Sequence, residues 1–133
     1  MAKDTSPSKS NSVLVIEDDR VISRLLTHWL KKRGFNVKVL NNGRQAVANL
    51  VTGDPPHLVF LDIIMPYADG FEVLSQIRAH KSWKKVPVIM LTSKSSEANI
   101  VRAFEAGADD YVTKPFKPGE LMVRMNRLLK KRL

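Results

Sequence analysis

The chain has 133 residues, a length that suits one domain with a single hydrophobic core. It contains no cysteine, which excludes a disulfide scaffold and thiol catalysis, and it shows neither a signal peptide nor an apolar run of membrane-spanning length. We therefore expect a soluble protein of the cytoplasm. Its formal net charge of +9 indicates that basic residues gather somewhere along the chain.

The first residues of the chain are polar and include serine, lysine and one proline. This composition predicts a disordered leader over residues 1–12, followed by one domain over residues 13–133. The domain begins with an apolar strand that runs into the acidic triplet Glu17-Asp18-Asp19. Such a triplet repels itself unless a cation or solvent offsets the charge.

Strands and helices then alternate five times along the chain. This alternation predicts an α/β fold with a single doubly wound sheet of five parallel strands. The expected strands are residues 13–16, 36–40, 58–61, 86–91 and 109–112, and the expected helices are residues 20–33, 43–51, 71–79, 96–106 and 117–133. The second strand alternates in polarity, which indicates a place near an edge of the sheet.

The last helix carries six basic residues against one acidic residue, a net charge of +5. Its apolar residues recur at i, i+1, i+4, i+7 and i+8, which predicts a stripe that faces the core. That stripe consists of Leu121, Met122, Met125, Leu128 and Leu129. Because no stacking aromatic residues and no helix-turn-helix accompany it, a solvated basic face is favoured over a nucleic-acid or membrane site.

Polar side chains stand where the strands end. Asp62 ends the third strand, Asp18 follows the first, Thr92 follows the fourth and Lys114 follows the fifth. The carboxyl ends of parallel strands border one crevice, so these groups are expected to converge. Two carboxylates suit Mg²⁺ (or Mn²⁺), while a hydroxyl and an ammonium suit phosphoryl oxygens. Asp62 would then be the nucleophile that forms an aspartyl phosphate.

Each of these groups also has a purely structural interpretation. Part of the acidic triplet suits the N-terminus of the following helix, and we assign that role to Asp19 and metal binding to Asp18. Thr92 suits a turn, and Tyr111 suits simple packing with its hydroxyl at the surface. Lys114 could be an ordinary solvated lysine, although the end of a buried strand is a poor place for one.

Four motifs, at these spacings, resemble the receiver domain of two-component response regulators. They are VLVIEDD at the first strand, VFLDIIMPYADGFE around Asp62, VPVIMLTS at the fourth strand and GADDYVTKPF at the fifth. The resemblance implies a flavodoxin-like receiver fold with strand order 2-1-3-4-5.

The resemblance also implies the metal ligands. Asp62 would be the phosphorylated aspartate and a ligand, and Asp18 would be a direct Mg²⁺ ligand. Glu17 would act through water, and the backbone carbonyl of Ile64 would be a further ligand. Many family members carry aspartate where this chain has Glu17, which should alter the geometry around the metal without abolishing binding.

For the phosphoryl group, the resemblance implies contacts from Thr92 and Lys114. Thr92 and Tyr111 would be the switch residues, with Tyr111 changing rotamer on phosphorylation. The Lys114-Pro115 peptide bond would be cis. The chain would thus be a signalling switch rather than an enzyme, although it would assist its own phosphorylation and dephosphorylation.

The expected phosphodonor is a sensor histidine kinase or a phosphotransfer protein. The face formed by the fourth helix, fifth strand and fifth helix would control a downstream target or a C-terminal output domain beyond this chain. A homodimer through that face is an open alternative, because charges that suit it are present. These are Glu105, Asp109, Asp110, Glu120 and Arg124. Ile100 stands where such dimeric receivers commonly have arginine.

Two other classes of protein remain open at this point. A small Mg²⁺-dependent phosphohydrolase would use the same aspartyl-phosphate chemistry, but it would need an acidic residue two positions after the nucleophile, where Ile64 stands. A flavodoxin-like nucleotide or flavin binder would need a glycine-rich or hydroxyl-rich loop after the first strand. The acidic triplet there would repel a phosphate unless a metal intervened.

Overall fold

The structure, a computed structural model, describes residues 12–65, 69–93 and 97–131. Most of the expected leader, residues 1–11, lies outside the described residues. Ser12 belongs to the first strand, which therefore begins one residue before its predicted start. The Lys114-Pro115 peptide bond is cis, as expected.

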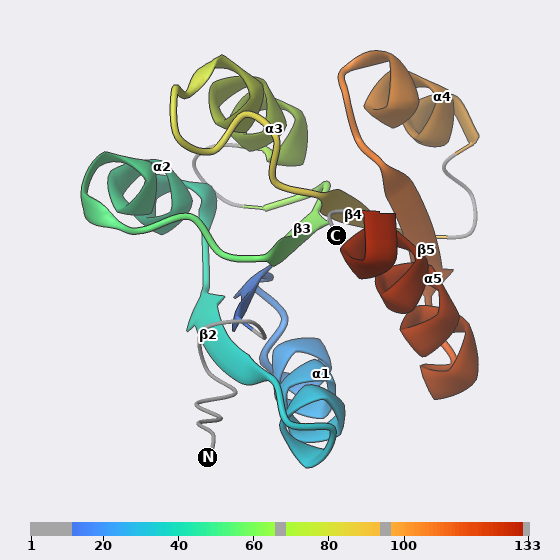
Figure 1. The fold of residues 1–133 in the computed structure, drawn as a ribbon. Helices are drawn as coiled ribbons and strands as arrows, with labels where there is room; N and C mark the ends of the chain where they lie inside the picture. Colours follow the sequence, from blue (N-terminus) through green and yellow to red (C-terminus); the bar gives the residue numbers. More distant parts are fainter. Residues whose placement is uncertain (1–11, 66–68, 94–96, 132–133) are drawn as a thin grey trace.

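Five parallel strands form one sheet in the order β2-β1-β3-β4-β5, with helices on both faces (Figure 1), so the predicted fold is confirmed. The strands are β1 (Ser12–Ile16), β2 (Asn36–Leu40), β3 (Leu58–Asp62), β4 (Val88–Ser93) and β5 (Asp110–Lys114). The helices are α1 (Arg20–Lys32), α2 (Gly43–Thr52), α3 (Gly70–Ala79), α4 (Glu97–Glu105) and α5 (Pro118–Lys131). None of the described helices has the length and apolar character that a membrane crossing requires.

The sheet separates two hydrophobic cores. One lies under α2, α3 and α4, and the other lies under α1 and α5. Every residue of β3 is buried, because alternate side chains enter the two cores, and this explains why the strand reads as a continuous apolar run. β2 is an edge strand, as predicted, and its residues are only partly covered.

The N-terminal cap of α1 and the apolar face of α5 agree with the sequence patterns. The side chain of Asp19 caps α1, since its Oδ1 accepts hydrogen bonds from the amides of Val21 and Ile22 at 2.9 and 3.2 Å. This confirms the capping role predicted for Asp19. On α5 the predicted apolar stripe faces the core, with Leu121 and Met125 fully buried.

β4 begins at Val88, two residues later than predicted, and the reason is a turn held by Arg78. The amide of Val86 donates to the carbonyl of Trp83 at 3.0 Å, while Pro87 has no amide hydrogen to offer a neighbouring strand. The carbonyl of Val86 accepts from the Arg78 guanidinium at 2.7 Å. The carbonyl of Pro87 still accepts from the amide of Val59 in β3 at 2.9 Å, but the backbone before Pro87 is held in the turn, so the strand does not extend further.

Arg78, at the end of α3, ties together the segments that enter β4 and β5. Its guanidinium also donates to the carbonyls of Lys84 and Gly107 at 3.1 and 2.9 Å and pairs with Asp109 at 2.8 Å. The same Asp109 oxygen accepts from the amide of Val88 at 2.8 Å. One partly buried cation thus satisfies three carbonyls and one carboxylate.

We predict that Arg78→Ala lowers the free energy of unfolding by about 2–3 kcal/mol, because it leaves several partly buried acceptors without their donor. Urea denaturation followed by tryptophan fluorescence would measure the change. As a control, Lys81→Ala, at an exposed position just beyond α3, should change stability by no more than about 0.5 kcal/mol. Equal effects of the two substitutions would contradict the role of Arg78.

Candidate functional site

The carboxyl ends of β1, β3, β4 and β5 border one pocket of about 230 Å³. Its lining is Glu17, Asp18, Asp19, Asp62, Ile63, Ile64, Leu91, Thr92, Asn99 and Lys114. Because the strands are parallel, their last residues lie at the same edge of the sheet, and this is where the sequence predicted convergence. The structure therefore brings the predicted polar groups of all four strand ends together.

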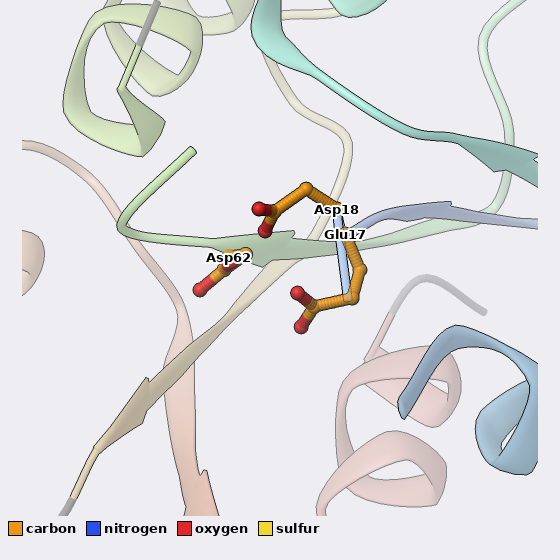
Figure 2. Close-up of side chains that lie close together, drawn as sticks. All are labelled: Glu17, Asp18 and Asp62. Atoms are coloured by element: carbon orange, nitrogen blue, oxygen red, sulfur yellow. The ribbon is translucent and has the colours of Figure 1, made fainter. Parts of the chain in front are cut away.

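Three carboxylates form the acidic part of the pocket: those of Glu17, Asp18 and Asp62 (Figure 2). Each contributes an oxygen that lies within 4.8 Å of the others. The pairing of β1 with β3 makes the two strand ends neighbours, because Ile16 is in register with Leu61. Glu17 is fully buried and Asp62 nearly so, whereas Asp18 is exposed at the mouth of the pocket.

The Lys114 ammonium lies between two of these carboxylates. Its Nζ is 2.8 Å from Glu17 Oε1 and 3.0 Å from Asp62 Oδ1. Burial raises the pKa of Asp62 to about 8, and the adjacent Glu17 adds to the rise, while Lys114 offsets it only in part. Burial acts to lower the pKa of Lys114, but the contacts with Glu17 and Asp62 outweigh burial and leave that pKa above its usual value.

The residues present fit a hydrated divalent cation. Glu17 Oε2 accepts from the amide of Asp19 at 3.1 Å. Glu17 Oε1 is buried and, although it lies at ion-pair distance from Lys114, it accepts no hydrogen bond within the described part of the chain. A buried oxygen with unused acceptor capacity, next to two further carboxylates, suits a metal-bound water, since Mg²⁺ keeps several of its waters in proteins.

Gly70, at the start of α3, fixes the backbone that follows Asp62. Its amide donates to the carbonyl of Ile63 at 2.7 Å. A Cβ atom at position 70 would collide with the backbone oxygen of Asp62 and would lie 2.8 Å from the Ile63 Cα. Only glycine allows this approach, so Gly70 is a positioning residue that the sequence patterns treated as part of a loop. The Asp-Gly pair before the helix was the available signal.

Thr92, Ile64 and Tyr111 differ in how they relate to the pocket. Thr92 is buried at the end of β4, in register with Thr113, and it lines the pocket. Ile64 also lines the pocket, with its side chain largely exposed. Tyr111 is not among the lining residues. Its ring makes an edge-on contact with Phe104 at 5.8 Å between centroids, so any part it plays is indirect.

Asn99 is a pocket residue that no sequence pattern indicated. It lies on α4, which begins at Glu97, shortly after β4 ends at Ser93. An asparagine on a helix carries no spacing signal for metal or phosphoryl chemistry. Its place in the pocket follows from how α4 packs on the sheet, which depends on tertiary contacts.

A family model described as the response regulator receiver domain matches residues 13–126 of the chain. The chain is 40% identical over 124 residues to the transcriptional regulatory protein ResD of Bacillus subtilis (strain 168), an alignment that covers 93% of this chain and 50% of ResD. The chain thus spans about half the length of this curated relative.

Solved structures show the same similarity. The receiver domain of the Francisella response regulator 1452 matches with a TM-score of 0.83 and 32% identity, covering 92% of this chain and 99% of that chain. The receiver domain of the sensor histidine kinase PA1611 from Pseudomonas aeruginosa PAO1 matches with a TM-score of 0.82 and 28% identity, covering 90% and 98%. That structure has a magnesium ion coordinated in its active-site cleft.

The raised pKa of Asp62 predicts a pH-dependent stability. The pKa of this carboxyl rises from an ordinary value of 3.8 to about 8 in the folded chain, so between these values the folded state binds the proton more tightly and stability falls as pH rises. Asp62→Asn removes the charge and should raise the free energy of unfolding of the metal-free protein at about pH 9 by about 1–3 kcal/mol. At about pH 5, where Asp62 is already protonated, the same substitution should change stability much less.

Urea denaturation in the presence of a chelator at both pH values would check this expectation. Asp54→Asn is a matched control, because it removes a carboxylate that is exposed to solvent. An equal gain from Asp62→Asn at the two pH values would show that burial does not raise the pKa of Asp62.

Within the acidic triplet, we predict that Asp18 binds the metal ion and that Asp19 serves as the cap of α1. Asp18→Asn should weaken Mg²⁺ binding roughly tenfold or more, because it removes a charged ligand from the three-carboxylate cluster. Asp19→Asn should weaken binding much less, since Asp19 caps α1 and asparagine also serves as a cap. Calorimetric titration with Mg²⁺ would measure both affinities, and similar losses in the two variants would mean that the roles are assigned wrongly.

Proposed function

Because the chain belongs to the response regulator receiver domain family, we propose that it is a phosphorylation-dependent switch that accepts a phosphoryl group on Asp62. The observation that carries this proposal is the convergence of Glu17, Asp18 and Asp62 with Lys114 at one edge of the sheet. Phosphoryl transfer requires positioning and charge neutralisation more than further covalent chemistry, and this set of groups supplies both.

In the proposed reaction, a carboxylate oxygen of Asp62 bonds to the phosphorus of a phosphohistidine in a sensor histidine kinase or phosphotransfer protein. The phosphorus–nitrogen bond breaks, and the histidine nitrogen leaves with the bonding electron pair while its ring takes up a proton. Only the ionised carboxylate is nucleophilic. Since the pKa of Asp62 is about 8 when Lys114 is its cationic neighbour, a second positive charge would favour the reactive form near neutral pH.

Asp18, Asp62 and the backbone carbonyl of Ile64 would hold Mg²⁺ (or Mn²⁺), and Glu17 would act through a bound water. When bound, this cation supplies positive charge beside Asp62 and the phosphoryl oxygens. Lys114, which lies 3.0 Å from Asp62, would transfer its contact to a phosphoryl oxygen. The hydroxyl of Thr92, at the neighbouring strand end, would donate to another.

The output surface that we propose is the face formed by α4, β5 and α5. The charges that suit a homodimer through this face are largely used within the chain. Asp110 pairs with Arg124 at 2.7 Å and with Arg127 at 3.1 Å, while Asp109 pairs with Arg78. On α4 the exposed side chains include the apolar Val101 and Phe104. A homodimer through this face remains a prediction, and it would rest on apolar contact more than on intermolecular ion pairs.

The controlled element would be a downstream protein or an output domain in a longer protein, as the half-length match to ResD suggests. We propose the cytoplasm as the compartment, because the phosphohistidine donors of this signalling system act there. The chain would be a signalling domain rather than an enzyme that acts on an external substrate. It would nevertheless assist its own phosphorylation through Lys114 and the bound cation.

Acetyl phosphate with Mg²⁺ should add one phosphoryl group to the wild-type chain, because the small donor presents the same phosphorus to Asp62. Intact-mass spectrometry would detect the adduct. Asp62→Asn should show none, whereas Asp69→Asn, which alters the cap of α3 outside the pocket, should be labelled like the wild type. A labelled Asp62→Asn protein would refute the acceptor assignment.

The proposed change of the output surface can be measured separately, by NMR of the wild-type and Asp62→Asn proteins. Phosphorylation should move the backbone amide resonances of α4, β5 and α5 in the wild type, and these movements should be absent from Asp62→Asn. Labelling of Asp62 without any movement on that face would leave Asp62 as the acceptor and refute the output surface.

A further inference from the structure

Positive charge gathers at the β2 edge of the sheet, which the sequence patterns did not single out. Between residues 20 and 53 there are seven basic residues and no acidic residue. They are Arg20, Arg24, Lys31, Lys32, Arg33, Lys38 and Arg44. These residues belong to α1 and the turn that follows it, to the edge strand β2, and to the start of α2, which covers the opposite face of the sheet from α1 (Figure 1).

Two basic residues of α5 are partly neutralised by ion pairs within the chain and are therefore less available to bind a partner. Arg124 and Arg127 pair with the buried carboxylate of Asp110. By contrast, neither Arg20 nor Arg24 takes part in an ion pair with any residue in the described ranges. Arg20 and Arg24 therefore keep their positive charge along α1, beside the edge strand.

A groove of about 440 Å³ runs between α1 and β2. Arg20, Arg24 and His28 recur every four residues along α1 and line the groove, together with Ser23 and Thr27 of α1 and Val39 and Asn41 from the β2 side. None of the described residues that line it is acidic. We call this feature the α1–β2 groove. Arginine side chains of α1 give it positive charge, and hydroxyl, amide and apolar side chains line the rest of it.

The strand that borders the groove has a free edge. β2 is the outermost strand of the sheet, and within the described residues it pairs only with β1. Such an edge offers backbone donors and acceptors to an extended polypeptide. Val39, half-buried beside the groove, would also give an apolar side chain a contact.

From these features we propose that the α1–β2 groove binds an extended acidic segment of a partner protein. The carboxylates of that segment would pair with Arg20 and Arg24, and its alternate apolar side chains would contact Val39. Nucleic acid fits less well, because the described lining of the groove has no aromatic side chain to stack on bases. A second copy fits less well too, because it would have to offer an acidic segment. The longest acidic run of this chain, Glu17-Asp18-Asp19, instead lines the pocket at the strand ends. The proposal does not depend on phosphorylation of Asp62.

The test uses a short synthetic peptide of alternating glutamate and valine, added to the isotope-labelled full chain without phosphodonor. The amide resonances of residues 20–28 and 36–41 should shift together. Arg20→Glu/Arg24→Glu should weaken binding roughly tenfold or more at low ionic strength, and added salt should weaken binding to the wild type. The control Lys81→Glu/Lys84→Glu makes the same charge change at two exposed lysines near the start of β4 and should weaken binding less than about twofold.

Several results would overturn the proposal. These are no binding to the wild type, shifts scattered over the surface, or equal losses in the two double variants. Tighter binding of a single-stranded oligonucleotide at the same residues would replace the protein partner with nucleic acid. Concentration-dependent dimerisation that Arg20→Glu/Arg24→Glu abolishes would replace it with a second copy. Unchanged Mg²⁺ binding and thermal unfolding in Arg20→Glu/Arg24→Glu would establish that the variant is folded.

Discussion

The contact of the Lys114 ammonium with the carboxylates of Glu17 and Asp62 is the interaction on which the rest of the site depends. Two carboxylates in so small and so buried a space repel each other and lose hydration, and one ammonium compensates only partly. The pKa of about 8 for Asp62 reflects this shortfall. The fold thus creates a deficit of positive charge at the position where the proposed chemistry requires a divalent cation.

The topology of the sheet explains why this charge deficit forms where it does. In the order β2-β1-β3-β4-β5, β1 and β3 are neighbours, so the residues that follow them share one edge of the sheet. β5 reaches as far as Lys114, in register with Ser93 of β4, and this register carries the ammonium to the carboxylates. A one-residue change in the register of β5 would turn Lys114 to the other face of the sheet.

The parts of this arrangement that follow from local signals could be predicted from the sequence. The order of strands and helices came from apolar periodicity. Asp62, Asp18, Thr92 and Lys114 were recognisable because each stands at the end of a predicted strand. Contacts between distant segments could not be predicted in this way. The late start of β4 depends on Arg78, which reaches carbonyls on two other segments. The location of free positive charge depends on Asp110, whose burial neutralises part of α5.

The contacts of Tyr111 set the energy scale of the proposed switch. Its ring packs edge-on against Phe104 of α4 and lies 5.5 Å from the guanidinium carbon of Arg124 on α5, so a change of rotamer would break contacts with both helices. An aromatic pair and a partly exposed cation–π contact together contribute about 1–2.5 kcal/mol. A charge-assisted hydrogen bond from Lys114 or Thr92 to a phosphoryl group contributes about 1.5–3 kcal/mol. The two quantities are of similar size, so one or two such bonds are enough to shift the balance between rotamers, and a larger packing energy at Tyr111 would prevent phosphorylation from acting as a switch.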